Sequence, residues 1–308
     1  MRPCDQQAAT RLEEALIDFD TKVCPLPGLR MSGNRHAFVE QLLESIRRIR
    51  YIAVIQARPI SAACAAPEND CFDPLKAAIL HERSGNTDES FWLVFLFVHF
   101  GKHLHGGWRY VRDLYGKFGE GGRWDWASTS TNIVGFRAWL HTHEGYFKRN
   151  GLPGGFGNHR KYESLGALSD NGTGAVVESY VQWVSPPRSH EVLFADALAE
   201  AEDDPHRAFD LLYQSMNALR RFGRTARFDY LTMIGKLGLA EIEPGTAYIS
   251  ESTGPRKGAQ LLFGSQSRTA LETLTTQLGN RLGVGMQVME DALCNWQKSP
   301  GIFRPFRG

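Results

Sequence analysis

Features that mark secreted, metal-binding and membrane-spanning proteins are scarce in this sequence. Its five cysteines are odd in number and none has Cys-x-x-Cys spacing, so reduced thiols are favoured over a disulfide framework. The N-terminus carries acidic residues early and lacks the apolar core of a signal peptide, which indicates a cytoplasmic protein. The apolar run 91–100 has ten residues, whereas a bilayer needs about 20, so we expect a buried helix and no membrane partner.

The charge balance excludes one broad class of nucleic-acid-binding protein. The 308 residues include 35 Lys and Arg against 34 Asp and Glu, which gives a net charge of +1. A polybasic protein that coats nucleic acid is therefore ruled out, and any surface for DNA must be a local patch. Hydrophobic residues at 42% and a mean hydropathy of −0.32 describe a soluble globular chain, without repeats of fixed period or low-complexity tracts.

Apolar residues recur at helical spacing through most of the chain, which predicts a mostly α protein. We expect roughly a dozen or more helices in one compact body of two lobes, with only a weak strand pair at 241–250. The expected helices cover 10–22, 36–55, 73–82, 89–103, 108–118, 131–148, 158–168, 175–184, 189–202, 205–222, 225–238, 254–263, 267–282 and 286–297.

A turn rich in glycine and proline, 151–161, lies between two of the expected helices. A short turn followed by a helix N-terminus presents unpaired N–H groups and a positive dipole end to an anion. The stretch resembles the Leu-Pro-Gly-x-Gly hairpin of helix-hairpin-helix proteins, which grips a DNA phosphate; it is also typical of an ordinary connector between helices. The residues expected to contact DNA are Gly154, Gly155, Gly157, Asn158, His159, Arg160 and Lys161.

Glu178 is the first candidate catalytic carboxylate. It follows Leu152 by 26 residues, after the apolar pair Val176 and Val177. Helix-hairpin-helix DNA glycosylases place a catalytic Asp at a similar distance, where a fixed carboxylate stabilises positive charge on the sugar or orients the attacking water. The structural alternative is a helix carboxylate paired with Arg188 or Arg160.

Asp229 is the second candidate, and it follows a run of arginines. Arg221, Arg224 and Arg227 precede it without an intervening acid, and phosphate neutralisation by such side chains gives DNA binding its affinity. An Asp in this setting stays ionised and can act as an electrostatic or water-positioning group. The structural alternative is a solvated network of Arg and Asp side chains between helices.

Three smaller groups of residues complete the candidate sites. The turn at 254–259 offers Arg256 and Lys257 as phosphate contacts, with Lys257 as a Schiff-base nucleophile in a remoter interpretation. The end of the apolar helix carries His99, Lys102 and His103, which we interpret as the wall of a polar pocket. A metal site is not expected, because no third ligand is indicated beside the two histidines. Trp108 and Tyr180 are aromatic side chains that could stack on an everted base, although most aromatics belong to the core.

Four segments together resemble the α-glutamyl/putrescinyl thymine pyrophosphorylase family, third clade. They are 97–103, 156–162, 223–230 and 252–255, and the resemblance extends over about 72–298. The resemblance implies kinship with helix-hairpin-helix DNA glycosylases, and hence a glycosylase-like helical fold. It divides the chain into an N-terminal helical segment 1–70, a catalytic region 71–298 and a C-terminal tail 299–308. Phage members of the family are linked to hypermodified thymine, and bacterial relatives to defence against phage DNA.

The function expected from the sequence is a DNA glycosylase that everts and excises a bulky modified pyrimidine of phage DNA. The alternatives are a transferase that displaces pyrophosphate from an activated hydroxymethyl pyrimidine in DNA, or a module that binds modified DNA without chemistry. The expected partner is double-stranded DNA with modified bases. No cofactor and no obligate protein partner are indicated.

Overall fold

The computed structural model describes residues 5–149, 153–161 and 163–306. Over these ranges the chain forms fourteen α-helices, short 3-10 turns and no β-strand, which confirms the prediction of a mostly α protein. The expected strand pair at 241–250 is wrong: this stretch is irregular and ends in the 3-10 turn Ile249–Glu251. Among the described helices, none is both long and apolar enough to cross a membrane.

The chain folds as two compact units. Unit 1 lies within Met1–Val54 and Pro244–Arg307, so the start and the end of the chain fold together, and unit 2 is Ile55–Glu243. The division at residues 70 and 298 stays a prediction from the sequence.

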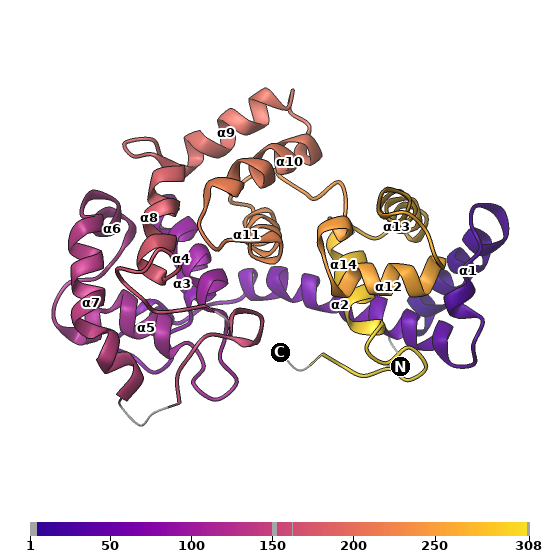
Figure 1. Ribbon diagram of the computed structural model, residues 1–308, viewed down its shortest axis with the longest axis horizontal. Coiled ribbons are helices and arrows are strands. Elements are labelled where there is room, and N and C mark those ends of the chain that lie inside the picture. The colour runs from indigo at the N-terminus through magenta and orange to yellow at the C-terminus, as the bar shows by residue number, and fades with distance from the viewer. Residues whose placement is uncertain (1–4, 150–152, 162, 307–308) are drawn as a thin grey trace. The chain divides into compact units, whose positions relative to one another are not determined.

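Unit 1 is a helical cluster with its own apolar core. Phe38 and Trp296 pack with ring centroids 5.0 Å apart, and both are fully buried. Helices α12 and α14 lie side by side (Figure 1), and a Cβ on Gly258 would come within 2.3 Å of the Leu293 carbonyl oxygen. The helices of unit 1 are α1 (Gln6–Lys22), α2 (Asn34–Gln56, whose last two residues belong to unit 2), α12 (Gly254–Phe263), α13 (Arg268–Leu282) and α14 (Met286–Trp296).

Unit 2 is built around one helix, α4 (Thr87–Phe100). The side chains from Phe91 to Leu96 are all 0% exposed, so α4 is apolar on every face and must be covered on every face. Helices α3, α5, α6, α9 and α11 all contact it. The other helices of unit 2 are α3 (Pro74–Arg83), α5 (Arg109–Tyr115), α6 (Trp126–Thr131), α7 (Ile133–Arg149), α8 (Thr173–Val184), α9 (His190–Glu200), α10 (Pro205–Ser215) and α11 (Arg224–Leu237).

Two helix boundaries differ from the sequence expectation in ways that affect function. Helix α4 ends at Phe100 because Gly101 has a φ of 62°, so His99 and His103 do not share a helical face. The helix expected at 158–168 is only the 3-10 turn Asn158–Arg160, followed by irregular chain. The extended run of N–H groups and the dipole that this helix was expected to aim at an anion are therefore not formed.

Glu89 is a buried carboxyl group in the first turn of α4. Its Oε2 accepts a hydrogen bond of 2.7 Å from the Trp126 backbone N–H, which joins α4 to the start of α6. Burial raises the pKa of Glu89 to about 7, more than the Trp126 hydrogen bond lowers it. The folded protein therefore holds a proton on Glu89 more tightly than the unfolded chain does.

This pKa shift predicts a pH-dependent loss of stability that Glu89→Gln removes. The contribution of protonated Glu89 to the stability of the fold is fully present below the ordinary pKa of 4.5 and is lost as pH rises through about 7. The melting temperature of Glu89→Gln relative to wild type should therefore rise between pH 5 and pH 8, by the equivalent of up to about 3 kcal/mol. A difference that is constant over this pH range would contradict the assignment.

Candidate functional site

The segment 153–161 packs on the C-terminal end of α4. The Gly157 N–H donates to the Phe100 carbonyl over 2.6 Å, and a Cβ on Gly157 would lie 2.7 Å from the carbonyl carbon of Gly101. A side chain at position 157 would therefore separate the two backbones, and the positive φ of Gly101 favours glycine at the other position. Gly151 and Leu152, at the start of the expected hairpin, lie outside the described residues, as does the side chain of Asn158.

Arg160 turns inward from this segment and caps α4. Its Nε donates to the Val98 carbonyl over 2.8 Å, one of the last carbonyls of the helix without an intrahelical partner. Its Nη2 donates to Asp229 Oδ2 over 3.0 Å. The guanidinium is nearly buried, with 9% of the side chain exposed, so its charge requires such partners.

Asp229 is the surface end of this arrangement. It projects from α11, and 45% of its side chain is exposed although one oxygen is bound to Arg160. The buried guanidinium fixes the position of the carboxylate, while the exposed part is accessible from solvent. The structure thus unites two residues that the sequence proposed for different roles, Arg160 for DNA contact and Asp229 for catalysis.

His99 lies beside Arg160 as a neutral imidazole. Its Nε2 is 3.0 Å from the Thr173 hydroxyl, which itself donates to the Ser164 carbonyl over 2.9 Å. Nε2 must therefore carry the hydrogen, because the Thr173 hydroxyl has already given its own. Burial, followed by the charge of Arg160, lowers the pKa of His99 to about 3. His99 thus joins the end of α4 to the start of α8 without adding charge.

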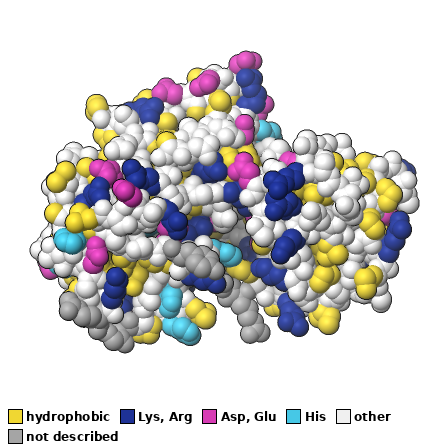
Figure 2. Space-filling model, viewed as in Figure 1, with side chains coloured by type: hydrophobic (Ala, Val, Ile, Leu, Met, Phe, Trp, Pro, Cys, Tyr) yellow, Lys and Arg dark blue, Asp and Glu magenta, His cyan; other side chains and the backbone are white. Residues whose placement is uncertain are grey.

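Two further arginines, Arg220 and Arg221, form ion pairs in unit 2, and the partner of Arg221 also interacts with Arg160. Arg221 Nε is 3.6 Å from Glu163 Oε2, and burial raises the pKa of Glu163 against the opposing effects of Arg221 and Arg160. Arg220 Nη1 is 3.3 Å from Asp170 Oδ1, and both side chains are more than half exposed. Both acidic and basic side chains lie on the face of unit 2 seen in Figure 2.

Glu178 is paired with a different arginine from Asp229. Its Oε2 is 2.5 Å from Arg137 Nη1 on α7, and Arg137 Nε donates to the Ala167 carbonyl over 3.0 Å. The sequence alternatives for its partner, Arg188 and Arg160, are both wrong. Arg188 binds the Val184 and Trp183 carbonyls instead. A catalytic role for Glu178 stays a prediction.

Tyr180 is part of the interior and does not line a base pocket. It is 0% exposed, and its hydroxyl lies 2.7 Å from His190 Nε2 and 2.9 Å from the Tyr230 hydroxyl. His190 continues the chain through Nδ1 to Asp88 over 2.6 Å. This hydrogen-bonded chain satisfies the polar groups of four helices in an apolar interior, so the expected stacking role for Tyr180 requires a correction.

Arg227 likewise faces the interior and not a DNA surface. Its guanidinium lies over the Tyr213 ring at 4.1 Å and donates to the Tyr213 carbonyl and to Asn217 Oδ1. By contrast, Arg224 lies over the Phe228 ring at 4.6 Å and is only half-buried. Arg224 and Arg227 are three residues apart on one helix, and their spacing in the sequence did not indicate which of the two is buried.

The remaining candidate residues are placed as follows. Lys102, His159 and Lys161 are exposed, Gly154 packs against Arg109 and Tyr110, and Gly155 packs near His103, whose Nδ1 accepts from the Gly106 N–H. Trp108 is half-buried and donates through Nε1 to Asp73. Arg256 and Lys257 belong to unit 1, where Arg256 binds the Ser250 carbonyl and Lys257 is exposed. Within the described part of the chain, no group of three or more His, Cys, Asp or Glu side chains is arranged to hold a metal ion.

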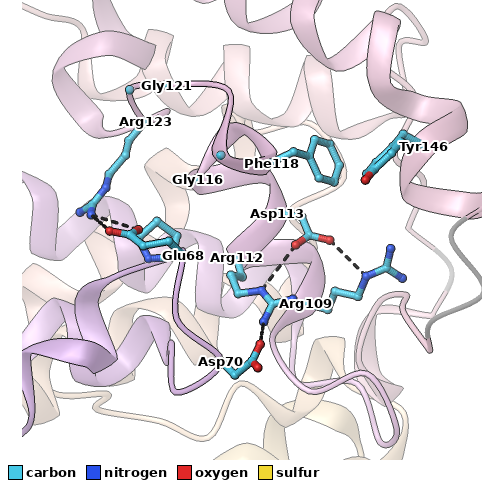
Figure 3. Close-up of a pocket in the computed structure, with 13 residues that line it drawn as sticks. Glu68, Asp70, Arg109, Arg112, Asp113, Gly116, Phe118, Gly121, Arg123 and Tyr146 are labelled. Atoms are coloured by element: carbon cyan, nitrogen blue, oxygen red, sulfur yellow. Dashed lines mark hydrogen bonds and ion pairs between the residues drawn. The ribbon is translucent and has the colours of Figure 1, made fainter.

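A second feature of unit 2 was missed by the sequence analysis. A polar pocket of about 670 Å³ lies between the chain at 67–70, helix α5 and the loop 116–123 (Figure 3). Arg109, Arg112 and Arg123 line it together with three acidic side chains. The signal available in the sequence was the run Gly119–Gly122, which lies between Arg112 and Arg123. It looks like any glycine-rich loop, because the sequence does not show that the arginines line one cavity.

These features define an all-helical protein with a solvent-accessible carboxylate held by a buried guanidinium at the end of a central helix. The chain matches the family model of alpha-glutamyl/putrescinyl thymine pyrophosphorylase clade 3 over residues 33–308, and it belongs to this family. The resemblance identified from the four sequence segments is thereby confirmed. No curated protein and no solved structure matches the chain.

The family overturns the function expected first from the sequence. The family is named for a pyrophosphorylase, an enzyme whose reaction releases or uses pyrophosphate, whereas a glycosylase hydrolyses the bond between base and sugar. The expectation of a glycosylase, and with it of a hydrolase that leaves abasic sites, is therefore wrong. The error arose from the glycine-rich turn and Glu178, which are features that a DNA-binding transferase could share.

Replacing Arg227 tests its structural assignment. Arg227→Ala should lower the free energy of unfolding by about 2–4 kcal/mol, because it leaves the Tyr213 carbonyl and Asn217 without their buried donor. The matched variant Arg220→Ala removes an exposed ion pair and should cost under about 1 kcal/mol. Urea denaturation measures both values, and equal losses would contradict the distinction.

Proposed function

We propose that this protein is a transferase that replaces the pyrophosphate of an activated hydroxymethyl pyrimidine in DNA with an amine. The observation that carries the proposal is membership of the thymine pyrophosphorylase family over residues 33–308. The family description names glutamyl and putrescinyl groups, both of which offer a primary amine as nucleophile. The substrate would be thymine that carries a diphosphate on its exocyclic methylene group.

The reaction requires one bond to form and one to break. The amine nitrogen bonds to the exocyclic methylene carbon, and the bond from that carbon to the diphosphate oxygen breaks with its electron pair leaving on pyrophosphate. An amine that arrives as an ammonium ion must give one proton to a base before it can attack, and the nitrogen loses a second proton after its bond to carbon has formed. The protein must therefore position an amine, accept a proton and stabilise the negative charge of the leaving group.

Asp229 is our candidate for the group that holds the amine and takes its proton. Its carboxylate reaches solvent, and Arg160 fixes it from the buried side, so a ligand can approach without displacing the pair. A carboxylate is also the natural partner of an ammonium group. His99, held neutral by burial, would not repel an incoming cation.

The surroundings of Asp229 support DNA as the macromolecular substrate. Arg220 and Arg221 pair with acidic side chains near the surface, and the Arg220–Asp170 pair is largely exposed, so it is worth only about 0–1 kcal/mol. A backbone phosphate could replace Asp170 as the partner of Arg220 at little cost. Exposed Lys161 would add positive charge from the segment that carries Arg160. Because no helix follows the described residues 153–161, their contact with DNA would depend on exposed side chains such as Lys161 and not on a helix-hairpin-helix grip.

The decisive experiment uses duplex DNA in which selected thymines carry a diphosphate on the methylene group. Incubation with putrescine or glutamate should release pyrophosphate, and nuclease digestion should yield a heavier nucleoside with its glycosidic bond intact. Omission of the amine should suppress the product, as should DNA that carries the hydroxymethyl group without diphosphate. Abasic sites, or an unchanged substrate with a mobility shift, would contradict the proposal.

Variants assign the chemistry to residues in the same assay. Asp229→Asn should lower turnover by about 10²–10⁴-fold, the usual contribution of a positioned general base. Because the change also removes the charge that faces the nearly buried Arg160, it should lower the melting temperature, and turnover is compared at a temperature at which the variant remains folded. Asp196→Asn is the matched control, since Asp196 is an exposed helical acid of α9. Glu178→Gln tests the other candidate, and a loss of turnover without a change in melting temperature would support its catalytic role.

A further inference from the structure

The polar pocket of unit 2 combines positive groups with partners that hold them loosely. In Figure 3, Arg123 points toward Glu68, and Arg112 lies between Asp70 and Asp113. The Arg123 Nη2 to Glu68 Oε1 distance is 3.2 Å, and Arg112 Nη1 is 2.5 Å from Asp70 Oδ1. The volume of about 670 Å³ is within the range of small-ligand sites.

The acidic partners of Arg112 and Arg123 differ in how firmly they are held. Asp70 is 98% exposed and Glu68 is 66% exposed, so each remains fully hydrated when it leaves the guanidinium. Ion pairs of this kind contribute about 0–1 kcal/mol. Asp113 is only 13% exposed and is shared by Arg109 Nε at 3.1 Å and Arg112 Nε at 3.5 Å. Asp113 therefore keeps the arginines in place, while Asp70 and Glu68 are exchangeable.

The loop 116–122 forms one wall of the pocket. Lys117, Phe118, Gly119, Gly121 and Gly122 all have positive φ, and Glu120 between them is right-handed. The Gly119 and Glu120 N–H groups donate to the Gly116 and Lys117 carbonyls over 2.8 and 3.0 Å, so the loop holds its own shape and the arginines supply the positive groups of the pocket.

Two aromatic rings form another wall of the pocket. Phe118 and Tyr146 meet edge to face, with centroids 4.5 Å apart, and Tyr146 is exposed. Phe118 is also held by Trp139 and Phe147, so its position is fixed before any ligand arrives. A pocket with guanidinium groups on one side and rings on the other suits a phosphate attached to a flat or hydrophobic group.

From these observations we propose that the pocket binds a phosphate-bearing ligand, with Arg112 and Arg123 exchanging Asp70 and Glu68 for phosphate oxygens. The carboxylates occupy the arginines until the ligand displaces them. This inference goes beyond the proposed transfer reaction, because phosphate binding here requires neither Asp229 nor turnover. The phosphate could belong to free pyrophosphate or to the DNA backbone, and the two sources are separable.

Calorimetric titration with inorganic pyrophosphate tests the first source, and titration with unmodified duplex DNA tests the second. Arg112→Gln and Arg123→Gln should each weaken binding of the relevant ligand at least 10-fold. Asp70→Asn and Glu68→Gln should instead tighten it by up to about 5-fold, the factor that corresponds to removal of a pair worth about 1 kcal/mol. An unfolded variant could not bind more tightly than wild type, so tighter binding by Asp70→Asn or Glu68→Gln would support the inference even if an arginine variant is unstable.

Arg207→Gln is the matched control, because Arg207 forms an exposed ion pair with Glu202 outside the pocket at 3.5 Å. It should leave pyrophosphate binding unchanged and alter DNA binding less than Arg112→Gln does. If Arg112→Gln and Arg123→Gln weaken the binding of pyrophosphate but not of DNA, the ligand is a free phosphate compound. If they weaken the binding of DNA but not of pyrophosphate, the ligand is the DNA backbone. If neither ligand binds, or if the pocket variants behave like Arg207→Gln, the inference is overturned.

Discussion

The guanidinium of Arg160 is the interaction on which the candidate site depends. It is almost buried, and it joins the end of α4, through the Val98 carbonyl, to Asp229 on α11. A charge in that position cannot be left without partners, since an uncompensated buried charge costs several kcal/mol. The negative end of the α4 dipole and the Asp229 carboxylate together supply the compensation. The segment that carries Arg160, the central helix and the candidate catalytic acid are thereby fixed to one another.

The composition of α4 explains why this junction lies where it does. A helix without a polar face must be surrounded, and its neighbours α3, α5, α6, α9 and α11 bury it until the chain turns at Gly101. The end of such a helix leaves carbonyl groups in the interior that water cannot reach. Gly157 and Arg160 satisfy two of them. The glycine-rich segment is thus a helix cap first, and any contact it makes with DNA uses its exposed residues.

The sequence predicted the elements of this fold better than their ends. Apolar spacing identified α4 and its burial because a ten-residue apolar run has few other solutions. The sequence analysis placed the end of α4 at His103, because one glycine within a helical pattern does not indicate that its φ is positive. The helix at 158–168 was wrong because a pattern after a Gly/Pro turn was taken for a helix start, whereas Gly157 and Arg160 are used against α4.

The site was predictable in its members but not in their pairing. Asp229 and Arg160 were both singled out, yet nothing in a separation of 69 residues indicates that they touch. Arg227 and Tyr180 were expected at a surface because residue type alone does not report which face of a helix is covered. The pocket around Arg112 and Arg123 was missed because its charges come from three separate segments, each ordinary by itself.

A double-mutant cycle on turnover tests most directly whether Arg160 and Asp229 act as one unit. The four proteins are wild type, Arg160→Met, Asp229→Asn and the double variant, assayed for amine-dependent pyrophosphate release under conditions in which all remain folded. If the guanidinium acts through the carboxylate, Arg160→Met should lower turnover strongly in wild type and add little once Asp229 is Asn. Effects that multiply, so that their free energies add within about 0.5 kcal/mol, would show that the two residues act independently and would contradict the account.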